Sequence, residues 1–192
     1  MPARLLVYHP LPHPRLRYVV DHVFGQRAGM ACEYTADNET FRGAAGPKIN
    51  YSDQDFGPET WSILPSGFLS GYDRLGWEKV VTRTGTLRFP LTSAGAYDPL
   101  AQVFFCLSRC EEYQPFQADR HGRFPAFASH AHRHGYLHYP LVDRVAAELA
   151  DELQRRFPGL QRSNAAAAIE VTYDIDLPWA YRHRGWRGIA SG

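Results

Sequence analysis

Two carboxylates follow a run of small and β-branched residues in the stretch "AIEVTYDID", residues 168–176. Side chains alternate along a strand, so Asp174 and Asp176 are expected to point the same way. The carboxyl ends of strands carry the active site in α/β folds, and two neighbouring carboxylates need a cation, a proton or a basic partner. Two interpretations are open: a divalent metal bound by one Asp while the other acts as a base, or structural ion pairs with basic residues 182–184.

Four histidines form a second cluster of chemistry-bearing residues: His130, His132, His134 and His138. Two His residues four positions apart on a helix can hold a metal, and His130 with His134 has that spacing. No Glu stands between them as a general base, and Gly135 is predicted to end the helix before His138. We therefore predict a partly exposed polar helix face and no metal site here.

Charged residues also concentrate in "SRCEEY", residues 108–113, and "DRHGRFP", residues 119–125. The pattern is typical of a helix C-terminus and a turn that are held by ion pairs. A binding role for this corner is the alternative, and nothing in the sequence supports it directly.

Composition limits the classes of function. The 21 basic and 20 acidic side chains leave a net charge of +1, which gives no electrostatic signal for nucleic acid or an anionic membrane. Three cysteines, Cys32, Cys106 and Cys110, are too few for a disulfide framework and are expected to be buried reduced thiols. The N-terminus has too short an apolar run for a signal peptide or a membrane span, which predicts a cytoplasmic location.

The front half of the chain reads as strand, helix and strand. Apolar runs predict strands over 4–10 and 31–37, with an amphipathic helix between them that ends near Gly25. This is a βαβ unit, so the two strands are expected to be parallel. A further short strand is expected over 46–52, and "WEKVVT" and "TLRFP" suggest strands within the Gly- and Pro-rich residues 53–97.

Helices dominate the next part of the chain. Asp98 is a predicted N-cap and Pro99 suits the first helical position of a helix within 97–113. A short helix is expected over 126–135 and a long one within 139–160. The predicted core consists of Leu5, Val7, Val19, Val23, Phe104, Leu107, Leu141, Val145 and Leu149. These elements predict an α/β fold, with a mixed sheet that contains the βαβ unit and is flanked by helices.

Several stretches, in order, resemble bacterial polysaccharide-deacetylase-like proteins, in which an uncharacterised N-terminal domain precedes a deacetylase domain of carbohydrate esterase family 4. They are "GPKINYS", "YDPLAQVFFCLSRCEEY", "DRHGRFPAFAS", "YPLVDRVAAEL", "FPGL" and "TYDIDLPWAYRHRG". Most of these motifs belong to the accessory domain of that group. The resemblance implies an accessory domain over residues 1–165, followed over 166–192 by the first strand of a truncated (β/α) barrel.

Only "TYDID" matches the first catalytic motif of that family, which is usually Thr-Phe-Asp-Asp. The resemblance implies that Asp174 corresponds to the catalytic base. The usual metal-ligand position is Ile175 here, so the metal role is carried to Asp176, as in members with Asp-x-Asp. The family's second motif, His-x-x-x-His, lies downstream of the first, so the upstream pair His130 and His134 is not assigned to it.

The resemblance also implies a function for the chain. The chain is expected to be the accessory domain of a metal-dependent deacetylase of N-acetyl sugars, inactive alone. Zinc or a similar divalent metal is expected in the full-length protein and not on this chain. The expected partners are the downstream deacetylase domain and a glycan, but neither nucleic acid nor a membrane, and the oligomeric state stays open. The alternative is an independent α/β module that binds a small molecule, a metal or another protein.

Overall fold

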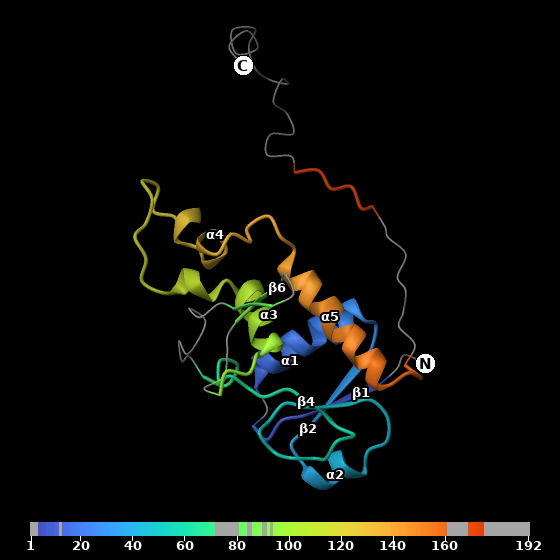
Figure 1. Cartoon of the computed structure of the whole chain (residues 1–192). Helices are drawn as coiled ribbons and strands as arrows, with labels where there is room; N and C mark the ends of the chain where they lie inside the picture. The colour runs from blue at the N-terminus through green and yellow to red at the C-terminus, as the bar shows by residue number, and fades with distance from the viewer. Residues whose placement is uncertain are drawn as a thin grey trace, which may run out of the picture.

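The computed structural model describes most of the chain. The described residues are 4–11, 13–71, 81–83, 86–89, 92, 94–160 and 169–174. Within them the protein is an α/β structure with one parallel sheet, several helices and a separate two-stranded hairpin (Figure 1). None of the helices in these ranges is both long enough and apolar enough to cross a lipid bilayer.

The parallel sheet has the strand order β2-β1-β3-β4. Its strands are β1 (Arg4–Tyr8), β2 (Ala31–Thr35), β3 (Lys48–Asn50) and β4 (Trp61–Ser62). β1 pairs in parallel with β2 on one side and with β3 on the other, which confirms the predicted βαβ unit. The predicted strands 4–10, 31–37 and 46–52 are all present, but each is shorter than its apolar run.

From β1 the chain passes to β2 on one side, and from β2 it crosses back over β1 to β3 on the other side. Because the two crossovers run in opposite directions, their helices cover opposite faces of the sheet. The first crossover runs through α1 (Pro14–Val20) and η1 (Asp21–Arg27), and the second through α2 (Asn38–Gly43). Figure 1 shows α2 below the sheet, with α1, α3 and α5 above it. The sheet therefore changes winding direction between β1 and β3, where α/β folds commonly bind ligands.

The first helix is longer than its sequence predicts. Gly25 is not a C-cap: the helix continues through it as the π-helical segment η1, which ends at Arg27 with Ala28 as its C-cap. The left-handed residue is Gly29, whose φ is 70°. The backbone N–H of Met30 then donates to the Phe24 carbonyl at 2.9 Å. Because of the wider π-helical turn, the left-handed glycine that terminates the helix is Gly29, four residues after Gly25.

The remaining helices agree closely with the sequence. The helix α3 (Pro99–Ser108) begins at the predicted cap, since an Asp98 oxygen accepts from the Ala101 N–H at 3.0 Å. The helix α5 (Leu141–Arg156) carries Arg155 and Arg156 in its last turn, where the helix dipole favours cations. Between them lie η2 (Cys110–Tyr113), η3 (Ala126–Ala128) and α4 (His130–Arg133).

The hydrophobic core lies between the sheet and the helices α1, α3 and α5. Seven of the nine predicted core residues are buried: Leu5, Val7, Val19, Val23, Leu141, Val145 and Leu149. Phe104 and Leu107 are only partly buried against the core. Because α3 is apolar on most of its surface and packs against both α1 and α5, it buries Leu100, Val103 and Phe105 more deeply.

The antiparallel strands form a separate pair and do not extend the main sheet. They are β5 (Val81–Arg83) and β6 (Thr86–Arg88), and they include part of the expected "WEKVVT" and "TLRFP" strands. The four-stranded sheet is therefore parallel throughout and not mixed. Residues 77–80 of the first expected strand lie outside the described residues.

The final described segment, residues 169–174, is not a strand in the structure. Ile169, Val171 and Tyr173 alternate along it and are 95%, 65% and 81% exposed. The expected strand is not formed because, within the described part of the chain, no neighbouring strand pairs with it. Asp176 and the rest of the expected barrel start lie outside the described residues.

Candidate functional site

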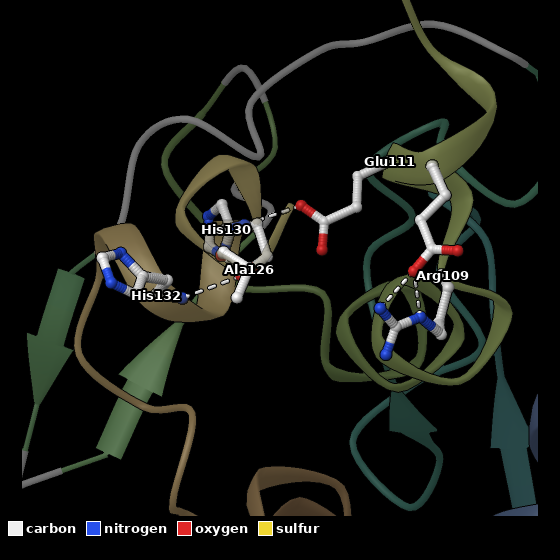
Figure 2. Close-up of polar contacts among 7 residues, drawn as sticks. Arg109, Glu111, Ala126, His130 and His132 are labelled. Atoms are coloured by element: carbon white, nitrogen blue, oxygen red, sulfur yellow. Dashed lines mark hydrogen bonds and ion pairs between the residues drawn. The ribbon is translucent and has the colours of Figure 1, made fainter. Parts of the chain in front are cut away.

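The corner that follows α3 is built around an unusual backbone conformation. Arg109 has a φ of 48° and a ψ of 37°, the left-handed region that residues other than glycine seldom adopt. It ends α3, and its guanidinium pairs with Glu112 three residues later. Ion pairs are predicted for this corner, and this one holds the start of η2. Figure 2 shows that the Glu111 side chain extends away from Arg109, toward His130.

Glu111 reaches across to a segment 19 residues further along the chain. Its carboxylate accepts a 2.6 Å hydrogen bond from the backbone N–H of His130, the first residue of α4 (Figure 2). Ser129 caps the same helix by accepting from the His132 N–H at 3.1 Å, while its hydroxyl donates to the Ala126 carbonyl. The acidic residue and the histidine segment are therefore one structural unit.

The imidazole of His130 lies in the protein interior. It is 2% exposed, its Nδ1 lies 2.7 Å from the Tyr136 hydroxyl, and its ring is 4.3 Å from that of Phe89. The prediction of a partly exposed histidine face is wrong for this residue, because α4 turns it toward α3 and the ring of Phe105. His132 and His138 are exposed, as predicted.

The four histidines do not converge on one point. The rings of His130 and His134 contact each other at a tilt of 43°, with centroids 4.3 Å apart, and α4 ends at Arg133, before the left-handed Gly135. His138 therefore lies beyond the helix, as the glycine predicted. Across the described ranges, no three His, Cys, Asp or Glu side chains are placed to hold a metal together.

A cavity of about 450 Å³ opens beside this unit. His130 and Phe105 form its buried floor, and Glu111 lies at its side. The remaining lining side chains are mostly aromatic, amide or cationic: Gln114, Phe116, Gln117, Phe124 and Arg133. The cavity combines flat apolar rings with polar groups that both donate and accept hydrogen bonds.

The loop that forms the outer wall is braced internally. Asp119 accepts from the N–H groups of His121 and Arg123 at 2.8 and 2.9 Å, and its side chain also pairs with the Arg123 guanidinium. The rings of Phe116 and Phe124 meet edge to face with centroids 5.0 Å apart. The ion pairs predicted for this corner are present, and they hold two aromatic rings at the cavity.

A smaller cavity, of about 260 Å³, shares Phe105, Glu111 and Phe124 with the first. Cys106 lies in it, and burial raises the pKa of its thiol to about 12. A thiol with so high a pKa is not a nucleophile near neutral pH. Cys32, Cys106 and Cys110 are all free, as predicted, but each is only partly buried.

Asp174 is not brought to this corner. Asp174 belongs to the exposed segment 169–174, and Asp176 lies outside the described residues. Their predicted roles as base and metal ligand therefore stay predictions.

Residues 5–158 match the model of a protein family described as a family of unknown function, DUF7033. The chain belongs to this family. The match includes the sheet, α5 and the Glu111–His130 unit, and it ends before Asp174. No curated protein and no solved structure matches the chain.

The sequence contained only part of this DUF7033 site. The sequence indicates the charged stretch 108–113 and His130 separately, but no spacing rule connects Glu111 with His130, because their contact is between a side chain and a backbone N–H. The aromatic pair Phe116 and Phe124 was not recognised as a pair. The closely spaced turn signals between these rings were the available indication that the two could meet.

Proposed function

We propose that this DUF7033 domain is the glycan-binding, non-catalytic accessory domain of a metal-dependent polysaccharide deacetylase. The supporting observation is the 450 Å³ cavity with aromatic and amide walls next to Glu111 and His130. Its volume lies within the range of small-molecule pockets, which is about 300 to 1,000 Å³.

Aromatic rings suit one face of a sugar. The C–H groups of a pyranose present an apolar surface that packs on an aromatic ring and is thereby removed from water. Phe116 is 40% exposed beside Phe124, so part of its ring is available to a ligand without a change in the core. Two rings in edge-to-face contact offer such a surface.

Sugar hydroxyls need both donors and acceptors. The amides of Gln114 and Gln117 supply both, while Glu111 accepts and Arg133 donates. Within the described residues, Glu111 uses one carboxylate oxygen to accept from the His130 N–H, so the other oxygen can accept from a sugar hydroxyl. Opposite charges line the cavity together, so an uncharged N-acetylated sugar suits it better than a strongly charged ligand.

The second half of the proposal concerns the segment after the family match. We propose that residues 169–174 begin the first strand of a deacetylase domain and that Asp174 acts there as the base. The alternating exposed side chains Ile169, Val171 and Tyr173 support this, because a strand of that pattern is stabilised when a neighbour covers one face.

The described residues do not fit a catalytic metal. Such a site takes about three protein ligands and keeps one open position, whereas Asp174 is an isolated exposed carboxylate here. We therefore derive no catalytic step on this chain. The proposal also places the protein in the cytoplasm, since three unpaired thiols suit a reducing compartment.

The sugar-binding half is tested by titrating the chain with tetra-N-acetylchitotetraose in a calorimeter. Binding is expected, and Phe116→Ala should weaken it about tenfold, because stacking on an aromatic ring contributes on the order of 1 kcal/mol or more. Phe127→Ala is the matched control, since Phe127 is 64% exposed and does not line the cavity.

Two results would overturn this half of the proposal. One is the absence of binding to this oligosaccharide and to other N-acetylated oligosaccharides at millimolar concentration. The other is an equal loss of affinity in Phe116→Ala and Phe127→Ala, which would place the sugar elsewhere on the surface.

A further inference from the structure

A second cavity, of about 360 Å³, lies beyond the carboxyl ends of β1 and β2. His9 follows β1, Thr35 ends β2, and Pro14 and Arg17 belong to α1, which forms one wall. The other lining residues are Val7, Leu16, Tyr34, Ala36 and His13. Ligands of open parallel α/β sheets bind beyond the carboxyl ends of the strands, most often where the winding direction changes. That point lies between β1 and β3, and this cavity opens beside it, at the ends of β1 and β2.

The backbone fixes the proton positions of both histidines. The Leu11 N–H donates to Nδ1 of His9 at 3.1 Å, and the Arg15 N–H donates to Nδ1 of His13 at 3.3 Å. A neutral imidazole that accepts at Nδ1 must carry its hydrogen on Nε2. Both rings at the cavity therefore have an Nε2–H that can donate to a ligand.

His9 is held firmly in this state. It is 9% exposed, and its ring stacks on Tyr51 with centroids 5.5 Å apart and an interplanar angle of 29°. Burial lowers its pKa, so it stays neutral near pH 7. The donor at Nε2 is thus preorganised and does not depend on protonation.

The charged side chain that lines this cavity is a cation. The Arg17 guanidinium lies 4.8 Å from the Tyr34 ring centroid and is exposed at the cavity. Two nearby carboxylates do not line the cavity and bond to other groups: Asp21 accepts from the Tyr34 hydroxyl at 2.6 Å, and Asp37 accepts from the Thr40 N–H at 2.7 Å. The remaining walls, from Val7, Leu16, Pro14 and Ala36, are apolar.

We infer that this cavity is a binding site for a small organic carboxylate. Its carboxylate group is bound by the two histidine N–H groups and Arg17, and its apolar body by the walls from β1 and α1. This site is separate from the proposed sugar site and rests on different residues, so either proposal can fail without the other.

Benzoate is the probe for this site, and benzamide is its uncharged analogue. Titration followed by two-dimensional amide NMR should show benzoate shifting signals around His9, His13 and Thr35. Benzamide should bind more weakly. Arg17→Gln should weaken benzoate binding and leave benzamide binding nearly unchanged, because it removes only the charge.

The histidine variants test the loss of the Nε2–H donor separately from a loss of stability. In His13→Asn the side-chain oxygen can replace Nδ1 and keep accepting from the Arg15 N–H, and Asn is itself a good N-cap. The Nε2–H is lost, so benzoate affinity should fall about tenfold or more while the melting temperature is kept. His9→Asn should likewise keep the hydrogen bond from the Leu11 N–H and lower the affinity for benzoate. His121→Asn is the control, because His121 is exposed and lies outside the cavity.

The inference is overturned if benzoate causes no shifts at millimolar concentration, or if it binds His13→Asn and Arg17→Gln as tightly as the natural sequence. Equal weakening in His121→Asn would also overturn it. Should His9→Asn fail to fold, the other two variants still decide the outcome.

Discussion

The phenol of Tyr51 donates a 2.8 Å hydrogen bond to the carboxylate of Asp98, and thereby joins the end of β3 to the start of α3. The same carboxylate accepts from the N–H and the hydroxyl of Ser66, each at 2.8 Å, and caps α3 through Ala101. Asp98 is fully buried, which raises its pKa, and the four hydrogen bonds oppose that shift. One side chain thus connects the sheet, a loop and a helix.

Asp98→Asn should therefore destabilise the fold. The new amide would replace an acceptor with a donor, and the Ser66 N–H or the buried Tyr51 hydroxyl would lose its partner. The expected loss is about 1–3 kcal/mol of unfolding free energy, measured by urea denaturation. Tyr51→Phe removes one hydrogen bond and should cost only about 1 kcal/mol. A larger loss in Tyr51→Phe than in Asp98→Asn would contradict this account.

The buried face of α5 gives a second stability prediction. Leu149 is 6% exposed, and Leu149→Ala should cost about 2–5 kcal/mol because it leaves a cavity against the core. Leu137 is 51% exposed, so Leu137→Ala should change the unfolding free energy by less than about 0.5 kcal/mol. Chemical denaturation of the two variants side by side checks this, and similar losses would show that the helix face is wrongly assigned.

Much of the fold could be predicted from the sequence because local signals and burial agree there. The cap at Asp98, the stop at Gly135 and the apolar face of α5 each follow from short-range rules. The end of the first helix could not be predicted, since Gly25 resembles a stop but the π-helical turn carries the chain past it. The two-residue strand β4 is too short to produce a periodic pattern.

The candidate sites were harder to predict, because they depend on contacts distant in sequence. Spacing alone placed His130 on a partly exposed face, whereas its backbone N–H bonds to Glu111 and its ring packs into the core. The acceptor role of Nδ1 in His9 and His13 comes from local backbone geometry that no motif encodes. Rules that pair residues along one helix cannot detect such contacts.

Burial of His9 predicts a dependence of stability on pH. Its pKa lies below the usual 6.5, so the unfolded chain binds this proton more readily than the folded protein does. The unfolding free energy should therefore fall as the pH drops below about 6.5, and rise again toward neutral pH. An NMR titration should place the His9 transition below those of exposed histidines. A transition at or above 6.5 would refute the prediction.

The histidine cluster should not bind transition metals tightly. His130 is buried beside Tyr136, His132 and His138 are exposed, and no three possible ligands gather among the described residues. Calorimetric titration with zinc should show no micromolar site. Micromolar zinc binding that disappears in His134→Ala would show that the cluster is a metal site after all.

The most direct test of the proposed function is acetate release from tetra-N-acetylchitotetraose with zinc present. The 192-residue chain should release none, because Asp174 and Asp176 supply fewer than the roughly three ligands of a catalytic metal. The longer protein that the proposal requires should release acetate, and its Asp174→Asn variant should lose most of the rate while retaining its metal. Metal-dependent release by the 192-residue chain, or a normal rate in the longer Asp174→Asn protein, would contradict the account.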